Sequence, residues 1–246
     1  TKPGLEQPIG AAAINRVPRQ MITDAVIEVM EEYDYYGEIF VEISIPEGVE
    51  LAKKTFNPRL GIEGGISVLG TSGIVEPMSE EALIASIRLE MQMHRNNGAE
   101  YLVISPGNYG TTYLSKNFQV NMEKAVKCSN YLGETIDMAV EMQYKGILFV
   151  SHIGKFIKVA GGIMNTHSRC ADSRMEILTA NALRAGAPLE ILKEILESVT
   201  TDEGLAVLKQ HGYLETTMKY IMEKIEFYLN NRAYQNLELA TLVFSN

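Results

Sequence analysis

The residues with the clearest potential for chemistry lie in one segment, residues 151–176. It holds two of the four histidines, His152 and His167, and two lysines spaced three residues apart, Lys155 and Lys158. An imidazole can accept or donate a proton near neutral pH, and a lysine ammonium group attracts anions. The segment therefore combines groups suited to proton transfer with groups suited to binding an anion.

A metal site is the competing interpretation of these histidines. The spacing of His152 and His167 does not place both on one helix face, and no carboxylate stands at a matching position. Cys128 and Cys170 are far apart and outside any CxxC pattern. Packed or hydrogen-bonding histidines are therefore favoured over metal ligands, and no disulfide framework is expected.

The elements that must position this segment alternate between strands and helices. Apolar runs at 66–69, 101–104 and 146–150 are separated by helical patterns, which predicts a parallel sheet with right-handed crossovers. Four further helices and a closing strand at 237–244 are expected after the segment. We predict a Rossmann-like α/β domain with flanking helices over residues 61–246.

Residues 1–60 have a different pattern, and we predict that they form the C-terminal remainder of an α+β domain. Pro18 suits the first turn of a helix, and residues 40–45 have a strand-like pattern that ends at Pro46. The opening residues lack an initiating methionine, which suggests a fragment of a longer chain. The predicted fold is therefore a large α/β domain preceded by a smaller, incomplete α+β portion.

Polar, glycine-bearing turns follow all three internal strands, at 70–73, 105–110 and 151–154. Open α/β sheets bind ligands outside the carboxyl ends of their strands, and glycine allows a ligand to approach the backbone closely. One such turn is weak evidence, because most turns of this kind merely connect a strand to a helix. Three along one sheet edge favour a small-molecule site.

The overall composition limits the partners. The chain has 246 residues and a net charge of −9, which argues against a general nucleic-acid binder. No apolar run approaches the roughly 20 residues needed to cross a bilayer, and no signal-peptide pattern opens the chain. The expectation is a cytoplasmic protein with no membrane partner.

Several uninterrupted runs resemble the CbiD family. They are KKTFNPRLGIEGGIS at 53–67, LGTSGIVEPMS at 69–79, PGNYG at 106–110, HIGK at 152–155 and AGGIMNTHSR at 160–169. The resemblance extends from Lys2 to about Leu192, and runs of this length are highly specific. Members of the family also carry an earlier portion with a Thr-Thr-Gly-Thr-type motif, which is absent here, so the contacts that it supplies have no place in this sequence.

The resemblance implies a methyltransferase of the oxygen-independent cobalamin (vitamin B12) pathway. The implied reaction moves a methyl group from S-adenosylmethionine to carbon 1 of cobalt-precorrin-5B, giving cobalt-precorrin-6A. Methyl transfer needs alignment and exclusion of water more than a covalent catalyst, so small and polar residues suit the donor site. The donor-binding candidates are Gly70, Thr71, Ser72, Gly73, Pro106, Gly107, Asn108 and Gly110.

The implied acceptor is a macrocycle with many acetate and propionate side chains, so cations and polar groups are expected around it. The substrate-binding candidates are Arg59, Lys155, Asn165, Ser168, Arg169 and Arg174. Either His152 or His167 is the candidate catalytic base. The cobalt belongs to the substrate, so no protein-bound metal is expected, and self-association is left open.

Two other functions compete with this one. A nucleotide-dependent enzyme would use the same strand ends for phosphates, but the GxxxxGK[ST] motif is absent and no acid follows the second strand to hold a ribose. A non-catalytic corrinoid- or nucleotide-binding module is the second alternative. Binding of S-adenosylmethionine and its demethylated product distinguishes the three.

Overall fold

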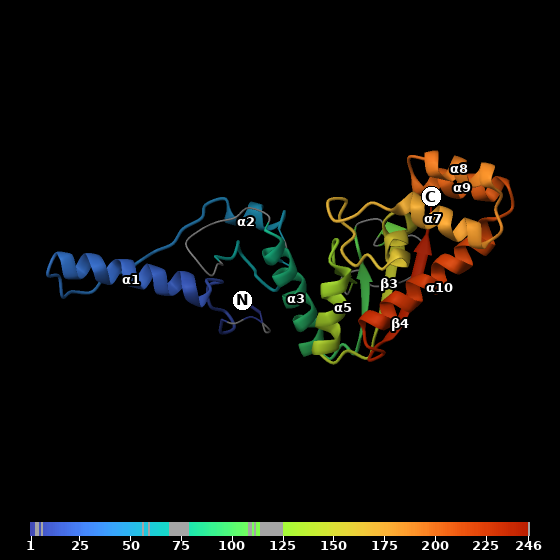
Figure 1. The fold of residues 1–246 in the computed structure, drawn as a ribbon. Helices are drawn as coiled ribbons and strands as arrows, with labels where there is room; N and C mark the ends of the chain where they lie inside the picture. The colour runs from blue at the N-terminus through green and yellow to red at the C-terminus, as the bar shows by residue number, and fades with distance from the viewer. Residues whose placement is uncertain are drawn as a thin grey trace. The chain divides into compact units, whose positions relative to one another are not determined.

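The computed structural model describes residues 1–2, 5, 7–55, 57–58, 60–68, 79–107, 110, 112–113 and 125–245. The chain divides into two compact units, Thr1–Asn96 and Asn97–Asn246 (Figure 1). The sequence prediction put its domain boundary between residues 60 and 61. That division stays a prediction, because compact units and domains need not coincide.

The larger unit is built on a four-stranded parallel sheet. Its strands are β1 (Tyr101–Ser105), β2 (Ala125–Lys127), β3 (Gly146–His152) and β4 (Glu238–Phe244), in the order β2-β1-β3-β4. All three neighbouring pairs are parallel, and Val103, Leu148 and Ala240 lie in one row across β1, β3 and β4. This sheet, with its helices, confirms the predicted α/β fold.

Helices connect and flank these strands. They are α5 (Leu132–Glu141), α6 (Ile153–Phe156), the 3-10 helix η2 (Ile157–Gly161), α7 (Arg174–Arg184), α8 (Leu189–Glu197), α9 (Thr201–Gln210) and α10 (Leu214–Arg232). Figure 1 shows α10 running back along the sheet towards the start of β4. The four helices predicted after the focal segment are therefore present as α7 to α10.

The core fixes where β3 ends and α6 begins. Phe149 on β3 and Phe156 on α6 are fully buried, with ring centroids 5.8 Å apart. Ile221, Ile225 and Leu229 of α10 are also fully buried, and α10 packs against η2 and α7. Packing of this density tolerates little displacement, so the turn after β3 has a defined place at the sheet edge.

The strand order creates a topological switch point. The chain leaves β1 for β2 on one side of it, then returns to form β3 on the other side. In open parallel sheets the crevice outside the carboxyl ends of two such strands is the usual ligand site. The carboxyl ends of β1 and β3 are Ser105 and His152, so the fold points to the turns that follow these two residues.

The smaller unit contains α1 (Arg16–Glu32), α2 (Gly48–Ala52) and α3 (Glu80–Asn96). The Ser79 hydroxyl accepts a 3.1 Å hydrogen bond from the Ala82 backbone N–H, so it caps α3.

Two strands predicted in the smaller unit are not formed there. Residues 40–45 are not a strand and pair with no described residue. Val68, in the predicted strand 66–69, makes only an isolated parallel bridge with Ile14. The expectation that this second strand would share a sheet with β1 and β3 is therefore wrong, since the four-stranded sheet does not include it.

Candidate functional site

The turns after β1 and β3 are joined by one side chain. Lys155, in the single turn of α6, donates a 2.9 Å hydrogen bond from Nζ to the backbone carbonyl oxygen of Pro106. The Ser105 hydroxyl donates a 2.7 Å bond to the carbonyl oxygen of Gly107, which fixes the other side of the first turn. The predicted donor-binding and substrate-binding turns therefore meet at the switch point.

His152 ends β3 and begins α6. Its Nδ1 accepts a 3.1 Å hydrogen bond from the Gly154 backbone N–H, so the imidazole caps this short helix. A Cβ at Gly154 would lie 3.0 Å from that Nδ1, which explains the glycine. His152 Nε2 faces Asp202 Oδ1 at 3.6 Å, and Phe244 contacts the ring edge-on. Both ring nitrogens therefore face protein groups.

Lys158 lies under the same region, in η2. Its side chain is buried, and Nζ donates to the carbonyl oxygens of Thr166 at 3.2 Å and Ala171 at 2.7 Å. Asp172 Oδ1 is 3.9 Å from the same nitrogen. A buried ammonium group held by carbonyls ties the loop 163–172 to η2, so Lys158 is a structural anchor as well as a positive charge.

The loop after η2 is also attached to the loop before α5. The Met164 carbonyl oxygen accepts from the backbone N–H groups of Leu132 and Gly133, at 3.1 and 3.2 Å. The Thr166 backbone N–H donates to the carbonyl oxygen of Asn130 at 3.0 Å. A Cβ at Gly133 would lie 3.0 Å from that of Met164, so the glycine permits this close approach.

Asp172 and Arg174 form a bidentate ion pair beside this loop. Arg174 Nε and one terminal guanidinium nitrogen donate to the two carboxylate oxygens at 2.7 and 2.9 Å. The guanidinium lowers the pKa of Asp172, and the carboxylate raises the pKa of Arg174. Ser173 stands at the N-cap of α7 without a side-chain cap hydrogen bond, and the Asp172 carboxylate beside it is engaged by Arg174.

These groups surround a polar pocket of about 370 Å³ at the carboxyl edge of the sheet. Three cationic side chains and one anionic side chain line it. The arrangement suits an anionic ligand, because Arg174 already shows the fork geometry that binds a carboxylate. The lining residues are Asn130, Gly154, Lys155, Lys158, Thr166, His167, Ser168, Asp172 and Arg174.

The structure brings four of the predicted residues to this pocket, namely Lys155, His167, Ser168 and Arg174. His167 is exposed, and its Nδ1 accepts a 3.1 Å bond from the Arg169 backbone N–H. Arg169 is exposed and does not line the pocket, and Asn165 Oδ1 caps the turn by accepting from the His167 backbone N–H at 3.1 Å.

The remaining predicted residues divide into two groups. Pro106, Gly107 and Gly110 lie in the turn joined to Lys155 or just beyond it. A Cβ at Gly110 would collide with Ser105 Oγ and the Val150 carbonyl, so this position requires glycine. The predicted residues that lie outside the described part of the chain are Arg59, Gly70, Thr71, Ser72, Gly73 and Asn108.

Sequence reasoning missed Asn130, Thr166 and the anchoring role of Lys158. Asn130 follows β2, a strand of three residues that gives no periodic signal. Lys158 was considered an anion-binding group together with Lys155, but the helix tightens to 3-10 geometry at Ile157 and buries the lysine. Its position two residues before Ala160-Gly161-Gly162 was the available signal of close packing.

Burial shifts the pKa values of two groups beside the pocket. Loss of solvent lowers the pKa of Lys155 from its ordinary value of 10.5, with Cys128 opposing and Lys158 adding to the shift. Burial raises the pKa of the Cys128 thiol to about 12, so this cysteine remains a neutral thiol near pH 7. Among the described residues, no cluster of three or more His, Cys, Asp or Glu side chains can hold a metal ion.

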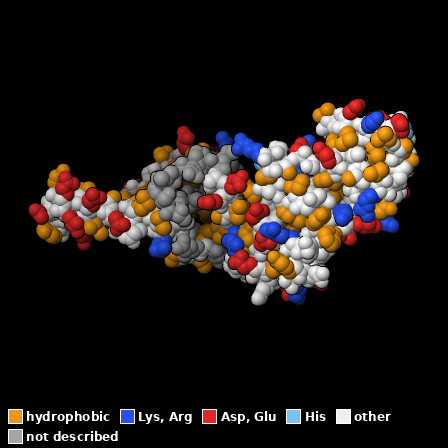
Figure 2. Space-filling view, viewed as in Figure 1, with side chains coloured by type: hydrophobic (Ala, Val, Ile, Leu, Met, Phe, Trp, Pro, Cys, Tyr) orange, Lys and Arg blue, Asp and Glu red, His pale blue; other side chains and the backbone are white. Residues whose placement is uncertain are grey.

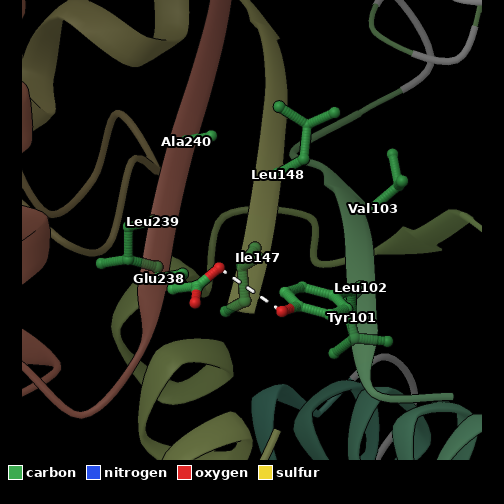
Figure 3. A pocket seen from close by; sticks show the side chains of 8 residues that line it. All are labelled: Tyr101, Leu102, Val103, Ile147, Leu148, Glu238, Leu239 and Ala240. Carbon is green, nitrogen blue, oxygen red and sulfur yellow. Dashed lines mark hydrogen bonds between the residues drawn. The ribbon is translucent and has the colours of Figure 1, made fainter. Parts of the chain in front are cut away.

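A larger pocket of about 540 Å³ lies elsewhere, on the sheet near the amino ends of its strands (Figure 3). Its lining is mostly apolar, with Val103, Leu148 and Ala240 from three neighbouring strands. The Tyr101 hydroxyl donates to a Glu238 carboxylate oxygen at 3.4 Å. It offers no cation and lies at the wrong end of a parallel sheet for catalysis, so the smaller polar pocket is the better candidate site.

Comparison with known proteins supports the resemblance seen in the sequence. The model of the CbiD family matches residues 1–77, and the model described as the C-terminal domain of CbiD matches residues 165–246. No solved structure matches the chain. No helix among the described residues is long and apolar enough to span a membrane.

Curated relatives match along the whole chain. A cobalt-precorrin-5B C(1)-methyltransferase of Ruminiclostridium cellulolyticum is 51% identical over 246 residues, covering 100% of this chain and 64% of the relative. One of Alkaliphilus metalliredigens is 43% identical with the same coverage. One of Methanocaldococcus jannaschii is 41% identical over 94% of this chain and 63% of its own length. The chain thus spans just under two thirds of these relatives.

Proposed function

The chain belongs to the CbiD family, and from this premise we propose that it forms part of a cobalt-precorrin-5B C(1)-methyltransferase. The reaction transfers a methyl group from S-adenosylmethionine to carbon 1 of cobalt-precorrin-5B and gives cobalt-precorrin-6A. The relatives with this name match the chain end to end, the first of them at 51% identity.

The observation that carries the proposal is the polar pocket at the switch point. Lys155, Lys158 and Arg174 bring three positive charges to a chain whose net charge is −9. A macrocycle bearing acetate and propionate groups needs such a local excess of cations. Arg174 supplies a bidentate donor, Lys155 an ammonium group held at the Pro106 carbonyl oxygen, and Lys158 a buried fixed charge.

The methyl donor fits the turn that follows β1. Among the described residues, a Cβ at Gly107 would meet only Lys155 Nζ, at 4.0 Å, which supports a close approach of a ligand to this turn. S-adenosylmethionine, when bound, supplies an electrophilic methyl group whose bond to sulfur breaks as the bond to carbon forms. Pro106 and Gly107 then serve to align the donor, and Lys155 links their turn to the acceptor pocket.

Of the two histidines, His167 is the better candidate to accept the proton that the macrocycle loses when the methyl group is added. It lines the pocket and is exposed, whereas the ring nitrogens of His152 face Gly154 and Asp202. Geometry comes before acidity in choosing a base, because the base must reach the proton. His152 then acts by holding α6, and thus Lys155, in place.

The experiment uses the natural-length protein with cobalt-precorrin-5B and S-adenosylmethionine carrying a CD3 group. We expect a product in which one hydrogen of the macrocycle is replaced by CD3, together with S-adenosylhomocysteine, and NMR should place the label at carbon 1. Omission of the donor is the control. Binding of both ligands without any transfer would support the non-catalytic module instead, and binding of neither would overturn the proposal.

A further inference from the structure

Helix α1 has an apolar side that the described structure does not bury. None of its 17 residues is buried, although Ile22, Val26, Val29 and Met30 form an apolar stripe at helical spacing and are partly or half exposed. In Figure 1 no other drawn helix or strand covers α1. Isolated helices of roughly this length are marginal in water, because most helical stability in proteins comes from packing one apolar face. Among the described residues, this helix therefore lacks the surface that should stabilise it.

The segment that follows α1 has the pattern of a strand with no partner. Ile39, Val41, Ile43 and Ile45 alternate with Phe40, Glu42 and Ser44, and the four alternating residues are 40–54% exposed. No backbone group of residues 39–44 forms a backbone hydrogen bond with a described residue. An extended segment with alternating side chains, whose backbone N–H and C=O groups are not paired with a described strand, can accept a further β-strand.

Charge argues against a second copy of this chain as the partner. Between Arg19 and Lys53 the chain has nine acidic residues and no basic one. Figure 2 shows acidic and hydrophobic side chains together over α1. Pairing two such segments would place like charges opposite one another, which is destabilising across strands. A partner with neutral or basic residues fits better.

The length of the relatives supplies a candidate for that partner. The matched relatives continue beyond the length of this chain, which spans 64% of the first two and 63% of the third. A segment of the same polypeptide reaches the free strand at high effective concentration, so it does not need the affinity of a separate protein.

We propose that residues 39–45 form a strand that pairs with a β-strand from the part of the natural protein outside these 246 residues. The added segment also covers the apolar side of α1. The partner strand presents apolar residues next to Ile39, Val41, Ile43 and Ile45, and a lysine or arginine near Glu42. This assembly is independent of the proposed methyl transfer, so each can fail without the other.

Hydrogen exchange tests the pairing in the 246-residue chain and in the natural-length protein. We expect the amides of residues 39–44 to exchange at least about 100-fold more slowly in the longer protein, because ladder hydrogen bonds open only with the surrounding structure. The amides of β3 serve as the reference and should be protected in both. Fast exchange of residues 39–44 in both proteins would overturn the proposal.

Protection already present in the 246-residue chain would also overturn it. If that protection increased with protein concentration, the partner strand would come from a second copy of the chain. If it did not, the partner strand would be another segment of the same chain. Substitution gives an independent test in the natural-length protein. Val41→Asp should lower the melting temperature by at least about 3 °C, whereas Ser44→Asp, on the opposite face, should not. Equal effects of the two substitutions would contradict a one-sided apolar interface.

Discussion

Lys155 Nζ lies 2.9 Å from the carbonyl oxygen of Pro106, and this hydrogen bond joins the turn after β3 to the turn after β1. The two strands flank the switch point of the sheet, where parallel α/β folds bind their ligands. A single lysine thus connects the expected donor turn with the pocket expected to hold the acceptor.

The charge of Lys155 should make macrocycle binding depend on pH. Burial lowers the pKa of Lys155 below 10.5, so the ammonium group loses its proton at a lower pH than a free lysine. Above that pKa the neutral amine no longer attracts carboxylates. We expect the Kd for cobalt-precorrin-5B to rise as the pH increases through this alkaline region. Calorimetric titration at several pH values measures it.

Lys155→Arg is the matched variant, because arginine keeps its charge throughout this range. Its Kd should change little with pH. Ionisation of the Cys128 thiol does not contribute to the change in Kd below about pH 11, because the pKa of this thiol is about 12. The same alkaline rise in Kd for both proteins would show that another group controls binding.

His152 should act through its cap on α6 rather than as a base. Asparagine is a good helix cap, so His152→Asn should retain most of the methyl-transfer rate, while His152→Ala should lose more of it. The matching substitution His167→Asn removes the candidate base and should reduce kcat by at least about 100-fold. Steady-state kinetics of the three variants measures these effects. A comparable loss in His152→Asn and His152→Ala would restore His152 as a candidate base.

Lys158 should contribute mainly to stability. Lys158→Met removes the donor to the carbonyl oxygens of Thr166 and Ala171 at a position where the residue is 4% exposed. Leaving buried acceptors unpaired should cost about 2–4 kcal/mol of unfolding free energy. Urea denaturation followed by circular dichroism measures it. Lys193→Met on α8, an exposed position, is the control and should change stability by less than about 0.5 kcal/mol.

The sequence predicted the larger unit well, because its elements carry strong local signals. The long apolar strand β3 and the periodic helix α10 follow directly from spacing. Strand β2 could not be predicted, since three residues show no period and its place depends on pairing with β1. The strand expected at 40–45 has the right pattern, but a strand exists only with a partner, and pairing is not a local property.

The site was predicted less completely than the fold. Lys155 and Arg174 do line the pocket, because both follow from a polar segment at the end of a strand. Asp172 was not among the predicted site residues, because its bidentate contact with Arg174 at the pocket is visible only in the folded chain. The anchoring role of Lys158 was not predicted, because burial of a lysine depends on carbonyl oxygens that only the folded loop brings together.

The central claim is that the pocket beside Lys155 and Arg174 binds the acceptor while the donor binds separately. Its most direct test is calorimetry of cobalt-precorrin-5B and of S-adenosylmethionine with the natural-length protein and its Arg174→Ala variant. Arg169→Ala, at an exposed position outside the pocket lining, is the control.

Arg174→Ala should raise the Kd for the macrocycle about tenfold, which corresponds to about 1.4 kcal/mol, and leave the Kd for S-adenosylmethionine within about twofold. Arg169→Ala should raise the macrocycle Kd by a smaller factor. An unchanged macrocycle Kd in Arg174→Ala, or an equal loss of affinity for both ligands, would contradict the assignment of this pocket to the acceptor.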